Sequence, residues 1–228
     1  MTQYVLAPQP QPSVPIAGVD ARFPVHRIYC IGRNYADHAK EMGHAPEKGD
    51  PIFFMKPADA VVADGRAARF PSATSNLHFE VELVVALRSG GREVPVECAL
   101  ELVYGYAVGI DLTRRDLQAA AKSRGAPWDT AKGFDDSAPL SHIVPCGGRH
   151  PQAEDMRLYV NGEMRQSVSV ADMLWPVPEI ISLLSGLYEL QPGDLIFTGT
   201  PAGVGPLQPT DRVACVLEGW ASLELQFA

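Results

Sequence analysis

Apolar residues in this chain either alternate with polar ones or run on over several positions, and both patterns favour strands. The segments 78–87 (HFEVELVVAL) and 103–110 (VYGYAVGI) are rich in Val, Leu, Phe and Tyr, which suit a pleated surface. Similar patterns predict strands at 25–34, 194–199, 212–219 and 221–228. A mainly β protein is therefore expected.

The dipeptide Asn161-Gly162 gives a clear local prediction. Strand-like residues lie on both sides of it, in the segment 158–166 (LYVNGEMRQ). Asn and Gly tolerate the two left-handed positions of a type I′ turn, so a β-hairpin is expected here.

Helical patterns are few and short. The segment 35–42 (YADHAKEM) follows Asn34, a suitable N-cap, and ends at Gly43, which predicts a two-turn helix. So short a helix is marginal in water, and the loop 41–50 follows it, so this segment is expected to be mobile. Two more helices are predicted, at 114–125 and 178–186. Strands and helices do not alternate regularly, so the predicted fold class is mixed, mainly β (α+β), with a few short helices.

Composition sets the domain organisation and excludes some partners. A chain of 228 residues with 46% hydrophobic residues can bury the core of one domain. The Pro-rich residues 1–22 are expected to form an extended arm, and residues 23–228 a single domain. The formal net charge of -8 argues against a nucleic acid or an anionic membrane as partner, because both reward basic surfaces. A small acidic substrate stays compatible, since it responds to the charges of one pocket.

The cysteines and the N-terminus bear on the compartment. Cys30, Cys98, Cys146 and Cys215 form no CxxC pair, which favours reduced thiols over a disulfide framework or a zinc site. The N-terminus lacks the basic start and apolar run of a signal peptide. No uncharged apolar stretch reaches the length of about 18 residues that spans a bilayer. A soluble, cytoplasmic protein is expected.

Glu80-Val81-Glu82 is the first candidate for chemistry. On one strand both glutamates would face the same side, about 6.6 Å apart along the chain. Two carboxylates at that spacing repel by about 2–3 kcal/mol at an effective dielectric near 20, and a cation between them would turn this cost into a binding site. A solvated strand face is the alternative interpretation.

Asp111 ends the apolar run from Tyr104 to Ile110, and Ala107 and Gly109 on its face would leave room for a ligand. Three carboxylates without a cysteine or histidine cluster favour a hard cation, Mg²⁺ or Mn²⁺. The alternative is an aspartate that caps the helix beginning near Arg114.

His38 and Glu41 lie three positions apart and so share one face of the short helix. A carboxylate beside a histidine orients the ring and raises its basicity, as a general base for water requires. A helix on a mobile segment would also suit a lid that closes over substrate. An incidental surface pair is the alternative.

Two further features are less specific. Lys132 lies in a Gly- and Pro-rich stretch that is expected to be irregular, where a lysine is normally a surface charge. The segment 197–205 (FTGTPAGVG) follows a strand, and backbone N–H groups in such a turn can hold a carboxylate. It could equally be a tight structural turn, and it is no dinucleotide fingerprint, because Pro201 interrupts it and no helix is expected to follow.

The order of these motifs resembles the fumarylacetoacetate hydrolase family, from about Arg27 to the C-terminus. The motifs are GRNYADHAKEMG, HFEVELVVAL, GYAVGIDLTRRDLQ, AKGFDDSAP and PGDLIFTGTPAGVG. The resemblance implies the family's β-roll fold, a homodimer and a Mg²⁺ or Mn²⁺ ion. It assigns Glu80, Glu82 and Asp111 as metal ligands, His38 and Glu41 as the water-activating dyad, Lys132 as the catalytic lysine, and Gln118 and Thr200 as substrate contacts. Thr113 and Arg114 depart from the family's usual residues, and Arg114 could alter the pocket.

Within the family, the chain looks most like fumarylpyruvate hydrolases of aromatic compound catabolism. The implied reaction is hydrolysis of a carbon–carbon bond in a 2,4-diketo acid, giving fumarate and pyruvate from fumarylpyruvate, with Lys132 stabilising the oxyanion. The far carboxylate of that diacid needs its own partner, for which Arg33 is the candidate and Arg114 the reserve. Four alternatives stay open: a short-chain acylpyruvate hydrolase, an oxaloacetate decarboxylase, an isomerase of unsaturated 2-oxo diacids and a non-catalytic metal-binding scaffold.

Overall fold

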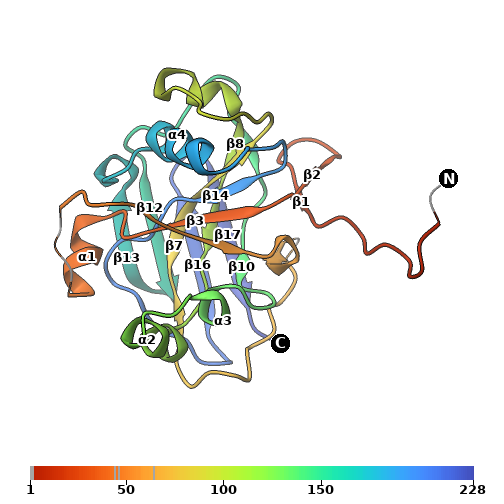
Figure 1. The fold of residues 1–228 in the computed structure, drawn as a ribbon. Coiled ribbons are helices and arrows are strands. Elements are labelled where there is room, and N and C mark those ends of the chain that lie inside the picture. The colour runs from red at the N-terminus through yellow and green to blue at the C-terminus, as the bar shows by residue number, and fades with distance from the viewer. Residues whose placement is uncertain (1–2, 44, 46, 64) are drawn as a thin grey trace.

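The centre of the molecule is a six-stranded sheet, seen in a computed structural model that describes residues 3–43, 45, 47–63 and 65–228. Its strands, in spatial order, are β11 (Val144–Pro145), β8 (Val103–Ile110), β7 (Val81–Leu87), β14 (Leu195–Phe197), β3 (Ile28–Gly32) and β4 (Ile52–Lys56). All neighbours pair antiparallel except β14 and β3, which are parallel. The apolar segments 78–87 and 103–110 thus contribute β7 and β8 at the middle of the sheet (Figure 1).

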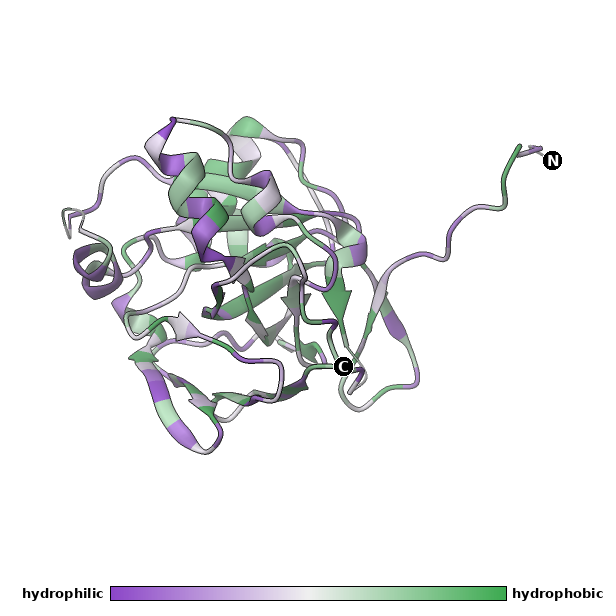
Figure 2. Ribbon diagram, turned by 90° about the horizontal axis from the view of Figure 1, so that it is seen from below, coloured by the Kyte–Doolittle hydropathy of each residue, from purple (hydrophilic) through white to green (hydrophobic). Residues whose placement is uncertain are grey.

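A second, four-stranded sheet packs on one face of the central sheet. Its order is β13 (Glu163–Ser169), β12 (Asp155–Val160), β16 (Arg212–Leu217) and β17 (Ala221–Gln226). Leu83 and Val85 of β7 join the same core as Leu158 of β12 and Val213 of β16. β7 and β8 are therefore buried on this face. In Figure 2 the strands in the interior of the molecule are largely green, the colour of hydrophobic residues.

The opposite face of the central sheet has a smaller core of its own. It contains Val84, Ala107 and Phe197 together with Val14 and Phe23. The last two belong to β1 (Ser13–Pro15) and β2 (Arg22–Pro24), which pair as a hairpin. The long apolar runs thus have no polar side because both faces of the sheet are covered.

Two smaller sheets complete the strands. β15 (Gly205–Pro206), β6 (Leu77–Phe79) and β9 (Thr113–Arg114) form one, and β10 (Ala138–Pro139) pairs parallel with β5 (Val61–Val62) in the other. β6 and β9 lie directly before β7 and after β8 in the chain. They extend the central pair toward the residues with candidate chemistry.

Helices are short and lie around the sheets. They are α1 (Ala36–Glu41), α2 (Arg115–Ser123), α3 (Asp129–Lys132) and α4 (Val177–Leu187), with 3-10 turns η1 (Ala58–Ala60), η2 (Val96–Leu102) and η3 (Val170–Asp172). In Figure 1, α1 lies at one side and α2 and α3 lie together below the sheet. Among the described residues, none of these helices has the length and apolar character needed to cross a membrane. The predicted fold class, mainly β with a few short helices, is confirmed.

Several local predictions are confirmed. Asn161 and Gly162 both have positive φ, at 51° and 85°, and join β12 to β13 as a hairpin. Gly125 follows α2 with φ of 62°, and α4 ends one residue beyond Gly186.

Two local predictions are wrong. The stretch around Lys132 is not irregular, because residues 129–132 form the one-turn helix α3. Asn34 does not cap α1, whose N-cap is Tyr35. Its amide instead donates to the carbonyls of Trp175 and Thr198, and its Oδ1 accepts from the Trp175 N–H. Asn34 thus fastens the start of the helix segment to the core.

The N-terminal residues divide into two parts. Residues 3–11 are exposed or nearly so and leave the body of the molecule as a tail (Figure 1). Residues 13–24 form the β1–β2 hairpin, which buries Val14 completely. The division into an arm of residues 1–22 and a domain of residues 23–228 stays a prediction.

Candidate metal and substrate site

Glu80, Glu82 and Asp111 come together at one end of the β7–β8 pair. Each has a carboxylate oxygen within 4.8 Å of an oxygen of the other two, and all three are buried. Glu82 pairs with Gly109 across the strands, and the Asp111 N–H donates to the Glu80 carbonyl at 2.8 Å. The ladder between the two strands therefore places the three side chains side by side.

Two details of how the chain forms this cluster differ from the sequence prediction. Glu80 does not lie within one strand with Glu82, because β6 ends at Phe79 and β7 begins at Val81. The space beside Gly109 does not admit a ligand, because a Cβ there would lie 2.8 Å from the Phe197 ring and from Val84. The glycine makes room for the core instead. Asp111 is no helix cap, since α2 is preceded by Arg114.

Two buried lysines neutralise part of the cluster. Lys132 Nζ lies 2.7 Å from Glu80 Oε2, 2.5 Å from Asp111 Oδ2 and 2.6 Å from Thr113 Oγ1. Lys56 Nζ lies 2.8 Å from Asp111 Oδ1 and donates to the Leu112 and Lys132 carbonyls. Lys132 is therefore no surface charge.

These contacts set the charge states of the site. Burial alone would raise the pKa of Glu80, but Lys132 and Arg115 outweigh it and hold that pKa below its usual range. Glu82 lacks such a partner, and burial together with Asp111 and Glu80 raises its pKa well above the ordinary value. Burial would lower the pKa of Lys132, but Asp111 and Glu80 raise it. Among the three carboxylates, Glu82 would therefore be stabilised most in its ionised form by a bound cation.

The residues present fit a divalent cation. All three candidate ligands offer carboxylate oxygens, the donors that Mg²⁺ and Mn²⁺ prefer. Asp111 Oδ1 is buried without a hydrogen bond, because Lys56 approaches it as a charge but not in hydrogen-bond geometry. A cation there would also remove the repulsion that raises the pKa of Glu82.

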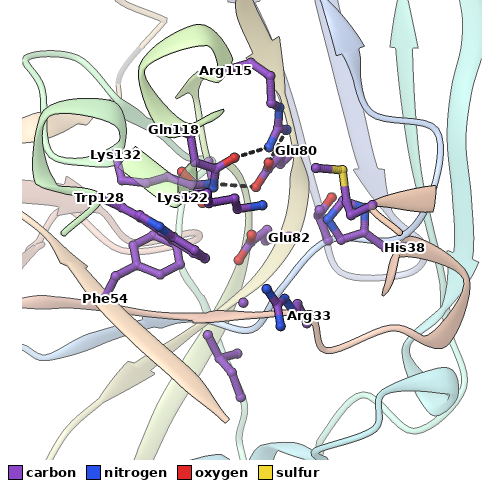
Figure 3. Close-up of a pocket in the computed structure, with 15 residues that line it drawn as sticks. Arg33, His38, Phe54, Glu80, Glu82, Arg115, Gln118, Lys122, Trp128 and Lys132 are labelled. Atoms are coloured by element: carbon purple, nitrogen blue, oxygen red, sulfur yellow. Dashed lines mark hydrogen bonds and ion pairs between the residues drawn. The ribbon is translucent and has the colours of Figure 1, made fainter. Parts of the chain in front are cut away.

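His38 lies across the pocket from Lys132 (Figure 3). His38 Nδ1 is 3.1 Å from Glu41 Oε2, and the His38 side chain is nearly buried. Glu41 Oε1 accepts a hydrogen bond from the Gly203 N–H at 3.0 Å. The Gly203 N–H therefore fixes the Glu41 carboxylate, and Glu41 in turn occupies Nδ1 of His38. Nε2 is then the His38 nitrogen left to contact a ligand in the pocket.

The turn 197–205 does hold carboxylates, and both belong to the protein. Besides the bond from Gly203 to Glu41, the Gly199 N–H donates to Glu82 Oε2 at 2.8 Å. Gly199 has φ of 93°, and a Cβ there would lie 2.7 Å from Asn34 Cβ, so only glycine fits. One turn thus positions both a candidate metal ligand and the dyad.

A single pocket collects most of the residues singled out in the sequence. They are Arg33, His38, Glu80, Glu82, Asp111, Gln118, Lys132 and Thr200. Glu41 supports the pocket through His38. Arg114 does not line it, because its guanidinium lies 4.3 Å from the centre of the Phe134 ring.

Sequence reasoning missed four polar residues around this pocket: Lys56, Arg115, Lys122 and Gln166. Arg115 bonds to Glu80 and donates to Gln118 Oε1 at 2.6 Å. Gln166 accepts from the Val81 N–H and donates to Thr200 Oγ1. The three-residue spacing of Arg115 and Gln118 on a helix could have revealed the first pair. No local pattern marks Lys56 or Gln166, which reach the site from other strands.

Comparisons with known proteins agree with this geometry. The model of the family described as fumarylacetoacetate (FAA) hydrolase C-terminal matches residues 27–228. The crystal structure of fumarylpyruvate hydrolase from Pseudomonas aeruginosa, in complex with Mn²⁺ and pyruvate, is 46% identical and superposes with a TM-score of 0.95 over 99% of each chain.

Two other relatives carry different activities in their names. The mitochondrial oxaloacetate tautomerase FAHD1 of Homo sapiens is 41% identical over 198 residues, which are 86% of this chain and 89% of that protein. The 2-hydroxyhepta-2,4-diene-1,7-dioate isomerase from Mycobacterium marinum is 32% identical with a TM-score of 0.80, over 91% of this chain and 76% of that one. The family match spans nearly the whole described fold and every carboxylate of the site, so the chain belongs to the fumarylacetoacetate hydrolase family.

Proposed function

We propose that this protein hydrolyses a carbon–carbon bond in a 2,4-diketo acid, and that its substrate is fumarylpyruvate, cleaved to fumarate and pyruvate. The observation that carries the proposal is the pocket in which a carboxylate cluster faces a histidine held by a carboxylate. The 46% identity and TM-score of 0.95 to a fumarylpyruvate hydrolase support the choice of substrate.

Glu80, Glu82 and Asp111 would hold a Mg²⁺ or Mn²⁺ ion. Bound there, the ion would act as a Lewis acid toward the carboxylate and 2-oxo group at the pyruvate end of the substrate. The contacts of Lys56 with Asp111 and of Arg115 with Glu80 fix these two carboxylates for this task.

His38 is the proposed general base. Its Nδ1 lies against Glu41, so Nε2 is the nitrogen that takes a proton from water in the pocket. Glu41 stabilises the imidazolium that results, and Gly203 keeps Glu41 in place. The water oxygen then bonds to the carbonyl carbon of the fumaryl group.

Lys132 is the proposed donor to the oxyanion. All three donors of the Lys132 ammonium group are engaged, by Glu80, Asp111 and Thr113. A divalent ion that binds the two carboxylates would release at least one donor for the oxyanion. Collapse of the oxyanion breaks the bond between the fumaryl carbonyl carbon and the next carbon. The bond electrons leave as the enolate of pyruvate, which takes a proton to give pyruvate.

A second candidate is interconversion of the keto and enol forms of oxaloacetate. The 41% identity to oxaloacetate tautomerase FAHD1 favours it. His38 and Glu41 could move a proton in that reaction without attack by water. The same pocket would also serve an acylpyruvate hydrolase, an oxaloacetate decarboxylase or an isomerase.

A substrate panel separates these activities. Mn²⁺-loaded protein is incubated with fumarylpyruvate, acetylpyruvate and oxaloacetate, while enol absorbance, pyruvate and carbon dioxide are followed. The proposal expects pyruvate and fumarate in equal amounts from fumarylpyruvate, at the highest specificity constant of the panel. Loss of oxaloacetate enol absorbance without pyruvate, and no turnover of fumarylpyruvate, would establish the tautomerase instead.

A homodimer is also proposed, because the resemblance to the family implies one, and a cytoplasmic location is proposed because the four cysteines are free thiols. Light scattering on the purified protein tests the first, and fractionation of cells tests the second.

A further inference from the structure

Two cations in the pocket have no carboxylate partner among the described residues. Four side-chain cations line the pocket, and Arg115 and Lys132 are bound to Glu80. Neither an ion pair nor a hydrogen bond to a carboxylate joins Arg33 or Lys122 to any part of the chain that the structure describes. These two side chains come from different segments, the residue after β3 and the last turn of α2.

Arg33 is held in the pocket at a cost. Its backbone has φ of 62°, a left-handed conformation that costs a non-glycine residue roughly 1–2 kcal/mol. Its Nε is buried and has no hydrogen-bond partner. Strain and an unsatisfied buried donor at one residue indicate a group that the chain itself does not supply.

The Lys122 ammonium group is surrounded by other charged groups of the pocket. Burial lowers its pKa, and the nearby Arg115 and Arg33 lower it further. Lys132 acts in the same direction and Glu80 opposes it. Lys122 lines the same pocket as Arg33 and the carboxylate cluster. Its Nζ lies 5.2 Å from the centre of the Trp128 ring, which gives the ammonium group a flat apolar neighbour (Figure 3).

The charge count of the pocket points to a polyanionic ligand. The cations at the pocket are Arg33, Lys56, Arg115, Lys122 and Lys132, and the carboxylates are Glu41, Glu80, Glu82 and Asp111. With a divalent ion bound, these groups would carry an excess of three positive charges, His38 not counted. A ligand with one carboxylate would leave most of this excess in place. A dicarboxylate that loses a further proton as an enolate would balance it.

We infer that Arg33 and Lys122 form a clamp for the carboxylate at the far end of a dicarboxylic 2-oxo acid, with Trp128 and Phe54 beside its carbon chain. This inference rests on the proposed function, which places the pyruvate end at Glu80, Glu82 and Asp111. Arg33 can make a planar, two-bond pair with a carboxylate, and Lys122 adds a point charge from the other segment. The clamp selects substrates by the presence of the second carboxylate.

Two unreactive ligands of equal length test the clamp without turnover. Calorimetry on Mn²⁺-loaded protein compares 2-oxoheptanedioate, which has the second carboxylate, with 2-oxoheptanoate, which ends in a methyl group. The wild type is expected to bind the diacid roughly 10–100-fold more tightly, the range of one or two charge-assisted hydrogen bonds. Lys122→Met and Arg33→Gln should each remove most of that margin and leave the affinity for 2-oxoheptanoate within about twofold.

Two further variants serve as controls. Arg124→Gln removes an exposed positive charge next to the end of α2, outside the pocket lining, and should keep the margin. Lys122→Arg keeps the charge and should restore most of the margin that Lys122→Met loses. Melting temperatures within a few degrees of the wild type show that each variant is folded.

The outcomes separate the clamp from the proposed function. Equal affinity of the wild type for both ligands, or an equal loss for both in the two variants, overturns the clamp. A diacid margin that the variants remove, in a protein that does not hydrolyse fumarylpyruvate, supports the clamp and overturns the proposed function. Hydrolysis of fumarylpyruvate without any diacid margin overturns the clamp and supports the proposed function.

Discussion

Lys132 Nζ lies 2.5 Å from Asp111 Oδ2, within the carboxylate cluster that would hold a divalent cation. A buried lysine at this place lowers the repulsion among the carboxylates, and it also competes with any cation for the same oxygens. The activity and stability of the site should therefore depend on whether the carboxylates contact only the Lys132 ammonium group or also a divalent cation.

Removal of the divalent ion should abolish turnover. Dialysis against a chelator is expected to reduce hydrolysis to background, and added Mn²⁺ or Mg²⁺ should restore it. Glu82→Gln should weaken Mn²⁺ binding at least tenfold by calorimetry, because it removes the ligand that has no lysine partner. The control is Glu163→Gln, which alters a glutamate whose side chain is 80% exposed and does not line the pocket. Full turnover after exhaustive chelation would contradict the assigned metal site.

Loss of the dyad should affect the rate far more than binding. His38→Ala and Glu41→Ala are each expected to lower kcat by about 10²–10⁴-fold, the usual loss of a general base. Mn²⁺ and oxalate should bind within a few fold of the wild type, because neither residue belongs to the carboxylate cluster. Turnover near the wild-type level in both variants would remove His38 from the mechanism.

Asp136 should make the protein sensitive to acid. Burial would raise the pKa of Asp136, but hydrogen bonds from Arg69 and Arg66 lower it to about 2. A carboxylate with a lowered pKa in the folded state stabilises it at pH values above about 4, and this contribution is lost as pH falls toward 2. The shift corresponds to about 2 kcal/mol at neutral pH, and the Asp136 side chain is only 3% exposed.

Asp136→Asn tests this directly. Asn tolerates the left-handed backbone at this position, where φ is 59°. Urea unfolding at pH 7 should show a loss of about 2 kcal/mol, and the difference from the wild type should close near pH 2. The matched control is Asp135→Asn, next in sequence but with a side chain 85% exposed. Equal effects of the two substitutions would show that the ion pairs of Asp136 do not stabilise the fold.

The segment that carries His38 should become more protected when ligand binds. Glu41 and Lys48 attach it to the body through Gly203 and Glu179, and Lys48 Nζ lies 4.1 Å from the centre of the Trp175 ring. Parts of the expected mobile segment 34–50, residues 44 and 46, lie outside the described residues. Hydrogen exchange of residues 34–43 should slow by roughly tenfold on addition of Mn²⁺ and oxalate. Unchanged exchange would argue against a lid.

Gly109→Ala should destabilise the fold. A Cβ at this position would lie 2.8 Å from Phe197 and Val84, both in the smaller core, so side chains must move. The expected loss is about 1–3 kcal/mol in urea unfolding, as for other overpacked sites. Gly186→Ala is the control, because nothing lies within 4 Å of its added Cβ near the end of α4. Similar stability of the two variants would show that the core near Gly109 has room.

The sequence by itself determined the class of fold and its family. Apolar runs at 78–87 and 103–110, the Asn161-Gly162 hairpin and the ends of α2 and α4 follow from local preferences of the residues concerned. The order of five motifs was sufficient to indicate the fumarylacetoacetate hydrolase family. It also selected Glu80, Glu82 and Asp111, which the structure brings together.

Only the tertiary structure decided how these residues are held and what charge surrounds them. Lys132 resembles a surface lysine in its local sequence, but α3 directs it between Glu80 and Asp111. Asn34 resembles a helix cap, but two carbonyl groups from distant segments bind its amide. The charges of a buried site depend on distances between segments far apart in sequence, which local patterns do not contain. For the same reason the position of Lys122 and Arg33, 89 residues apart in sequence, in the lining of one pocket became apparent only in the folded chain.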